Sequence, residues 1–93
     1  MNNKEELKIT KDFLQDIFDL NSKEYVQICR ILTSTDNDAY FEDIVLYRIK
    51  DQKYFKFEFC NCEHLHWTSE NLNTFPIIAK QVYQKIINCI IYE

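Results

Sequence analysis

Four soft side chains fall within seven residues of this sequence. They are Cys60, Cys62, His64 and His66. Thiolate sulfur and imidazole nitrogen are ligands that zinc prefers, so the cluster is a candidate metal site. On an extended strand the four would line one face, about 6.6 Å apart per pair, and only neighbours could chelate one ion. A tetrahedral site would then need Cys29 or Cys89 from another element, or a segment that curls as a loop.

The same cluster has a simpler interpretation. Cys60 and Cys62 could be small apolar residues on the less buried face of a sheet, with both histidines near its solvated edge. The paired C-x-x-C spacing of common zinc sites is missing, which favours this interpretation. A histidine and a cysteine could also act as base and nucleophile, but no oxyanion cradle or second acid supports catalysis. We expect no cofactor and no enzymatic activity, with a small zinc-binding domain as the alternative.

The segment 36–43 combines negative charge with aromatic rings. It holds four carboxylates, two aromatic side chains and no basic residue. Exposed acids beside aromatic rings suit docking into a basic groove, where charge steers association and the rings supply contact area. The candidate partner-binding residues are Asp36, Asp38, Tyr40, Phe41, Glu42 and Asp43. An ordinary solvated loop is the alternative, whereas a calcium loop is disfavoured because the glycine of an EF-hand is absent.

One basic cluster surrounds a predicted turn. Its members are Arg48, Lys50, Lys53 and Lys56, next to Tyr47 and Tyr54. The cluster could meet a phosphate backbone, which makes a nucleic-acid-binding accessory protein another alternative. The net charge of -4 opposes phosphate neutralisation, however, and lysines also protect the exposed edges of hairpins. Direct nucleic-acid binding is therefore disfavoured.

Composition bounds the function further. The 93 residues contain no glycine, and this excludes phosphate loops, dinucleotide fingerprints and nucleophile elbows, which need glycine for sharp turns or close main-chain approach. The length predicts one domain over residues 1–93. Residues 1–9 could alternatively be a flexible N-terminal segment. A domain this small buries little surface and is only marginally stable, so a homodimer is an alternative to a monomer. Met1 to Phe13 lack the apolar run of a secretion signal, so we expect a cytoplasmic protein with reduced cysteines. No apolar run is long enough to predict a membrane span.

Periodicity predicts an N-terminal helix over 10–20, with Thr10 as its N-cap and Asn21 in the left-handed conformation at its end. Residues 23–34 are ambiguous. The β-branched residues favour a strand, but polar residues recur at helical spacing, and we favour a second helix over a strand.

A hairpin is predicted over 40–50 and 53–60, because Tyr54 to Phe59 alternate apolar and polar residues. A three-residue turn at 51–53 would put Val45, Tyr47 and Ile49 on the face of the phenylalanines. A turn at Asp51-Gln52 would instead put Ile44, Leu46 and Arg48 there and require a positive φ at Gln52, so we favour the longer turn. Leu65 and Trp67 extend the same face into a third strand.

The tail 75–93 predicts a C-terminal helix, since polar residues at 80, 81, 84, 85 and 88 oppose Ile78, Val82, Ile86 and Ile90. Pro76 suits the first turn of such a helix, and Asn73 or Thr74 its cap. The predicted fold is α+β. It is a single small domain with one or two N-terminal helices, an antiparallel hairpin or three-stranded sheet, and a C-terminal helix packed on the sheet.

In size, acidity, its abundance of amino acids that AT-rich codons encode, and its acidic aromatic segment, the chain resembles small phage or mobile-element inhibitors of the anti-CRISPR type. The resemblance covers class only, without a shared motif. It implies a non-enzymatic inhibitor that blocks the basic nucleic-acid-binding surface of a larger host defence protein in the host cytoplasm. The carboxylates of 36–43 would then stand in for phosphates.

Overall fold

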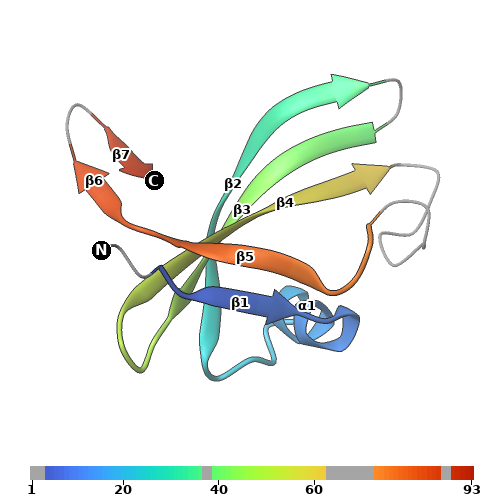
Figure 1. Cartoon of the computed structure of the whole chain (residues 1–93). Helices are drawn as coiled ribbons and strands as arrows, with labels where there is room; N and C mark the ends of the chain where they lie inside the picture. The colour runs from blue at the N-terminus through green and yellow to red at the C-terminus, as the bar shows by residue number, and fades with distance from the viewer. Residues whose placement is uncertain (1–3, 37–38, 63–72, 87–88) are drawn as a thin grey trace.

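The computed structural model describes residues 4–36, 39–62, 73–86 and 89–93. Five strands form one antiparallel sheet in the order β1-β5-β4-β3-β2, and β6 pairs with β7 in a separate hairpin (Figure 1). The strands are β1 (Glu6–Ile9), β2 (Tyr25–Asp36), β3 (Ala39–Arg48), β4 (Lys53–Cys62), β5 (Ile77–Val82), β6 (Gln84–Ile86) and β7 (Ile90–Tyr92). Helix α1 (Lys11–Phe18) connects β1 to β2, the two edge strands of the sheet.

The fold is mostly β, so the predicted α+β fold with helices at both ends is wrong. The tail forms β5, β6 and β7 in place of a C-terminal helix. The four-residue spacing of Ile78, Val82, Ile86 and Ile90 fits one helix face, but it is also a multiple of the two-residue period of a strand. The many isoleucines of the tail favour the strand.

The second helix favoured at 23–34 is also wrong, because these residues lie mostly in β2. The strand contains two irregularities in its pairing with β3, between Gln27 and Cys29 and between Leu32 and Ser34. A β-bulge adds one residue and so shifts the alternation of side chains. Two bulges within ten residues therefore hide the two-residue period in the sequence.

The predicted hairpin is confirmed as β3 and β4, but in neither of the two registers that we considered. Residues 49–52 form a four-residue turn, which places Ile44, Leu46 and Arg48 on the face of the phenylalanines, as the disfavoured turn would have done. Leu46 pairs with Phe55 and Ile44 with Phe57, and Gln52 has a φ of 58°. The amide of Gln52 donates to the carbonyl of Arg48 at 2.9 Å, which closes the turn. Ile44 and Leu46 are fully buried in this register. Hydrophobic burial therefore outweighs the cost of one left-handed residue.

The predicted N-terminal helix is confirmed as α1. The amide of Phe13 donates to Thr10 Oγ1 at 3.2 Å, which is the expected N-cap. The left-handed residue at its end is Leu20, with a φ of 59°, and not Asn21. Upstream, residues 6–9 form β1 against β5, so this part of the predicted flexible segment is ordered by strand pairing.

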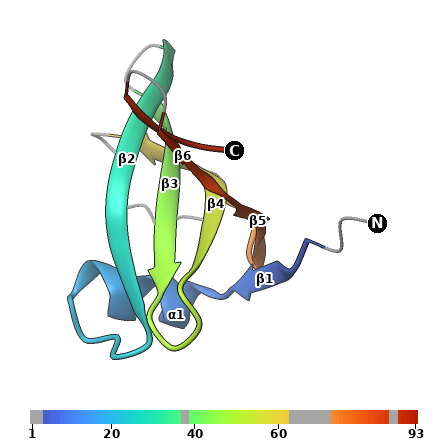
Figure 2. The same cartoon turned by 90° about the vertical axis from the view of Figure 1, so that its left-hand side faces the viewer.

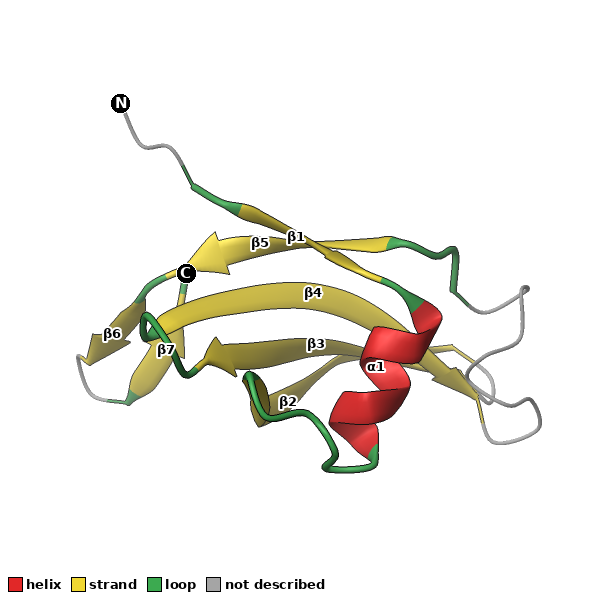
Figure 3. Ribbon diagram, turned by 90° about the horizontal axis from the view of Figure 1, so that it is seen from below, coloured by secondary structure: helices red, strands yellow, loops and turns green. Residues whose placement is uncertain are grey.

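The hydrophobic core lies between α1 and one face of the sheet, which we call the helix face (Figure 3). Leu14 and Ile17 of α1 are buried there. The sheet contributes Ile9, Tyr25, Ile44, Leu46, Phe55, Phe57, Phe59 and Ala79. At one end of this core the guanidinium of Arg30 lies over the rings of Phe18 and Phe59 and binds the carboxylate of Glu42.

Arg48 closes the other end of the core and is only 7% exposed. Its guanidinium lies 4.9 Å from the ring centroid of Phe55. It donates to both oxygens of Glu5 at 2.7 and 2.9 Å, to both oxygens of Asp51 at 2.9 and 2.7 Å, and to the hydroxyl of Tyr25 at 3.4 Å. All five N–H groups of the guanidinium are therefore used. The network joins β2, β3, β4 and the segment before β1.

The carboxylate of Glu5 predicts how stability depends on pH. Its pKa is lowered from 4.5 to about 2, first by the hydrogen bonds from Arg48 and then by the bond from Lys53. A carboxyl with a lower pKa in the folded state stabilises the fold above its unfolded pKa and loses that contribution as pH falls towards the folded pKa. Between pH 4.5 and 2 we therefore expect a steep fall in melting temperature, and a shallower fall in Glu5→Gln, measured by circular dichroism.

The matched control is Glu24→Gln, because the exposed Glu24 side chain has no ion pair or hydrogen bond to the described residues. This variant should keep the wild-type slope. An unchanged slope in Glu5→Gln would contradict the assignment.

Candidate functional site

The sheet face opposite α1, which we call the outer face, carries the candidate site. Alternation and the β3–β4 register define its members. On β3 they are Ala39, Phe41, Asp43, Val45 and Tyr47, and on β4 they are Tyr54, Lys56, Glu58, Cys60 and Cys62. The hairpin of β6 and β7 folds back beside β3 and β4 (Figure 2).

The C-terminal hairpin covers one half of the outer face. The ring of Tyr92 lies 5.2 Å from that of Tyr54, which lies 5.1 Å from that of Tyr47. The amine of Lys56 donates to the carbonyl oxygen of Tyr92 at 3.2 Å. Burial, with smaller contributions from Tyr92 and Tyr47, raises the pKa of Tyr54. This half of the outer face is an internal packing surface.

The basic cluster predicted around the turn is largely used within the fold. Arg48 is buried in its network, Lys53 donates to Glu5 at 3.2 Å, and Lys56 binds Tyr92. Lys50 is exposed. Binding to a phosphate backbone would require these cations to be free on one surface. The structure instead uses Arg48, Lys53 and Lys56 in contacts within the fold.

Residues 39–43 of the acidic segment lie at the start of β3, so their side chains alternate between the two faces of the sheet. Phe41 and Asp43 lie on the outer face, whereas Tyr40 and Glu42 lie on the helix face. The charge of Glu42 is neutralised by Arg30. Asp36 is exposed at the end of β2, and Asp38 lies outside the described residues. The structure therefore brings together only Phe41 and Asp43 of the predicted set.

Glu58 is a site residue that the sequence prediction missed. It lies directly opposite Asp43 in the β3–β4 ladder. Within the described ranges, neither carboxylate takes part in an ion pair or side-chain hydrogen bond. Only the register could have revealed the pair, because the three-residue turn that we favoured places Asp43 opposite Asn61.

Exposed apolar side chains surround the two carboxylates. Ile31 of β2 lies opposite Asp43 on its other side and is 48% exposed. Ile78 of β5 is 41% exposed, and Phe41 is partly exposed. We call Ile31, Phe41, Asp43, Glu58 and Ile78 the acidic aromatic patch. Negative charge flanked by apolar area is the chemistry of a protein-docking surface for a basic partner.

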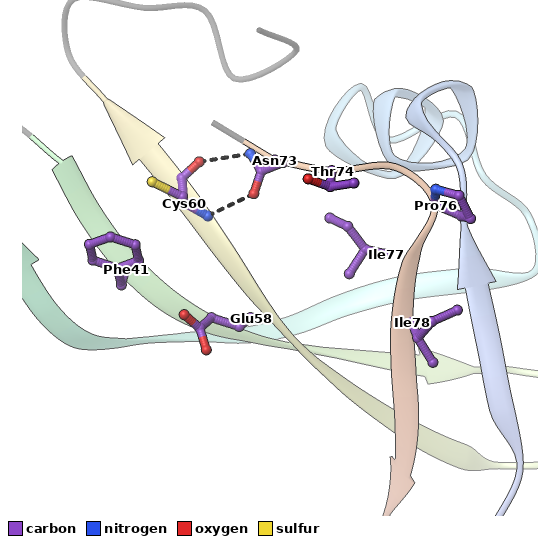
Figure 4. Close-up of a pocket in the computed structure, with 8 residues that line it drawn as sticks. All are labelled: Phe41, Glu58, Cys60, Asn73, Thr74, Pro76, Ile77 and Ile78. Atoms are coloured by element: carbon purple, nitrogen blue, oxygen red, sulfur yellow. Dashed lines mark hydrogen bonds between the residues drawn. The ribbon is translucent and has the colours of Figure 1, made fainter. Parts of the chain in front are cut away.

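A cleft of about 430 Å³ lies beside this patch, where β4 and β5 separate (Figure 4). Its lining residues are Phe41, Glu58, Cys60, Asn73, Thr74, Pro76, Ile77 and Ile78. The side-chain amide of Asn73 closes one end. It accepts from the amide of Cys60 at 3.0 Å and donates to the carbonyl of Cys60 at 2.9 Å. The Asn73 side chain thus takes the place of a neighbouring strand's main chain. It does not cap a helix as we predicted.

Only two of the four residues of the alternative zinc site lie in the part of the chain that is described. Cys60 and Cys62 lie on the outer face of β4, while His64 and His66 fall outside the described residues. No three potential ligands gather in the described ranges. Burial raises the pKa of Cys60, with additions from Cys62 and Glu58, and burial also raises that of Cys29. Both thiols therefore stay protonated and weakly nucleophilic at neutral pH.

Comparison with protein families, with characterised proteins and with solved structures finds no match to this chain. Residues 4–36, 39–62, 73–86 and 89–93 contain no helix long and apolar enough to cross a membrane. The function must therefore be inferred from the geometry of the outer face.

Two variants of Asn73 test its hydrogen bonds to the main chain of Cys60. Asn73→Ala removes both partners of Cys60, so the Cys60 amide should exchange with solvent faster, by about tenfold for a hydrogen bond of ~1.4 kcal/mol. Asn73→Asp retains the acceptor and should keep most of the protection. Hydrogen exchange followed by NMR measures both, and equal protection in all three proteins would contradict the assignment.

Proposed function

We propose that this chain is a non-enzymatic protein-binding module that docks its acidic aromatic patch on a basic surface of a larger protein. The observation that carries the proposal is the cross-strand pair of Asp43 and Glu58, two carboxylates that face each other and form no ion pair among the described residues. Three other carboxylates of the sheet and its turns are paired with arginine. Glu5 and Asp51 bind Arg48, and Glu42 binds Arg30.

The energetic cost of the pair supports a role in binding. Like charges directly opposite each other on neighbouring strands destabilise a sheet by a few tenths of a kcal/mol to about 1 kcal/mol. A lysine or arginine of a partner placed between Asp43 and Glu58 converts this repulsion into attraction. Ile31, Phe41 and Ile78 then supply apolar contact area around the charges, an arrangement that suits a binding hot spot.

The partner proposed from this chemistry is a protein with a basic groove, such as the nucleic-acid-binding surface of an effector. The resemblance to anti-CRISPR-type inhibitors implies the same partner class. Asp43 and Glu58 would take the place of two phosphates, with Asp36 as a further charge near the end of β2. Blocking such a groove requires a preformed surface and no chemical step, and it would occur in the cytoplasm of the host cell.

The double variant Asp43→Asn/Glu58→Gln tests the proposal. We expect it to lose most of its partner capture in affinity purification from the host, and its association with the purified partner to slow by about tenfold or more at low salt. The salt dependence of association should flatten as well, because fewer charges steer the encounter. Mass spectrometry and surface plasmon resonance measure these effects.

The matched control is Asp16→Asn/Glu24→Gln, which changes the net charge equally at exposed positions away from the outer face. This control should bind like the wild type. The patch variant should melt at or slightly above the wild-type temperature, because its repulsion is removed. Equal binding by the two double variants would contradict the proposal.

A further inference from the structure

The ladder between β4 and β5 stops early. It pairs Tyr54 with Val82, Phe55 with Gln81, and Lys56 with Lys80. Continuing this register would pair Glu58 with Ile78. That pair is not formed, and at Cys60 the side chain of Asn73 takes the place of β5.

Hydrogen bonds on either side of this interruption show which way the main-chain N–H and C=O groups point. The main-chain amide of Gln81 donates to the carbonyl of Glu5 at 2.9 Å, so the main-chain N–H and C=O groups of Gln81 point towards β1. The main-chain N–H and C=O groups of successive residues in a strand point alternately towards the two neighbouring strands. The N–H and C=O of Ile78 therefore point towards β4. On β4, the N–H and C=O of Cys60 point towards Asn73, so those of Glu58 point towards β5.

The main-chain groups of Glu58 and Ile78 consequently face each other across the cleft, without a ladder partner in the described ranges. A main-chain N–H or C=O without a partner costs free energy unless water or a ligand bonds to it. The cleft thus offers two hydrogen-bonding strand edges at one place. Its volume of about 430 Å³ lies within the range of small ligand sites.

The charges around the cleft give it a polarity. At the end where β4 and β5 pair, opposite the end that Asn73 closes, Lys56 binds the carbonyl of Tyr92, and Lys80 lies opposite Glu6 of β1. Between these two ends, on the outer face, the carboxylates of Glu58 and Asp43 form no ion pair in the described part of the chain. Phe41 and Ile78 form apolar walls. An occupant that satisfies all three features has a peptide main chain, an apolar side chain and a basic side chain.

We propose that the cleft between β4 and β5 receives a short extended segment of the partner, whose main chain pairs with Glu58 and Ile78 and whose lysine or arginine meets Glu58 and Asp43. The inference rests on the proposed function and adds the form of the partner's element. Strand pairing to the main chain supplies affinity, and the carboxylates select a basic side chain.

A titration of isotope-labelled protein with a defined peptide tests the cleft directly. The probe is acetyl-Val-Lys-Val-Lys-Val-amide. We expect the amide signals of Glu58 and Ile78 to shift saturably. Replacing both lysines of the probe by glutamate, or N-methylating its central valine, should weaken binding by about tenfold, the loss of one charge-assisted or main-chain hydrogen bond of ~1.4 kcal/mol. Unmoved signals, or equal binding of the N-methylated probe, would overturn the inference.

A blocking variant separates the cleft from the patch. Thr74 lines the cleft and is exposed, so Thr74→Trp should fill the cleft without changing any charge. The control is Thr35→Trp, exposed near the end of β2 on the side of Tyr40 and away from the outer face. We expect Thr74→Trp alone to lose peptide binding and about tenfold or more in partner affinity.

The outcomes distinguish the two proposals. If Thr74→Trp captures the partner as well as the wild type does while Asp43→Asn/Glu58→Gln fails, the patch docks the partner and the cleft inference is overturned. If the probe binds the cleft but the charge variant captures the partner normally, the proposed function fails. If Thr74→Trp does not fold, the peptide titration of the wild type alone decides the cleft inference.

Discussion

One buried guanidinium determines how this small sheet is held together. A charged group taken out of water is tolerated only when its hydrogen-bonding groups and its charge are matched. Arg48 meets this condition with two bidentate carboxylates, a hydroxyl and an aromatic ring. Its partners are far apart in the sequence. The positions of β1, β2 and the β3–β4 turn are consequently coupled through one side chain.

The two faces of the sheet treat charge differently. On the helix face each arginine lies at an end of the core and is matched by carboxylates, with aromatic rings beneath both guanidinium groups. On the outer face, Asp43 and Glu58 oppose each other without such a match in the described residues. Stability alone favours removal of this repulsion. The contrast is why binding is assigned to the outer face and structural roles to the helix face.

The edge strands of the sheet are less suited to pairing with an added segment than the cleft is. Edge strand β2 exposes Val26, Ile28, Ile31 and Leu32, and such an edge invites pairing with other chains. Two bulges interrupt it, and Ser22 Oγ accepts the amide of Tyr25 at 3.2 Å. Bulges disfavour pairing at an edge. The other edge strand, β1, has only four residues. The interruption between β4 and β5 therefore offers the more defined place for an added segment.

Local signals in the sequence were sufficient for α1 and the β3–β4 hairpin. The Thr10 cap, the apolar stripe of α1 and the alternation through Phe55, Phe57 and Phe59 depend on neighbouring residues alone. The same local rules found Phe41 and Asp43 as candidate binding residues. They also predicted helices where β2 and β5 lie, because two bulges hide the period of β2 and a four-residue spacing fits both structures.

The tertiary structure decided the hairpin register, and with it the site. Burial of Ile44 and Leu46 against the phenylalanines, together with the network of Arg48, selects a turn that local propensity disfavours at Gln52. That register places Glu58 opposite Asp43 and turns Glu42 towards Arg30. The sequence by itself determined which residues could form strands and which carried charge. Which charges meet depended on non-local burial, because a shift in pairing costs little locally but exposes an entire apolar face.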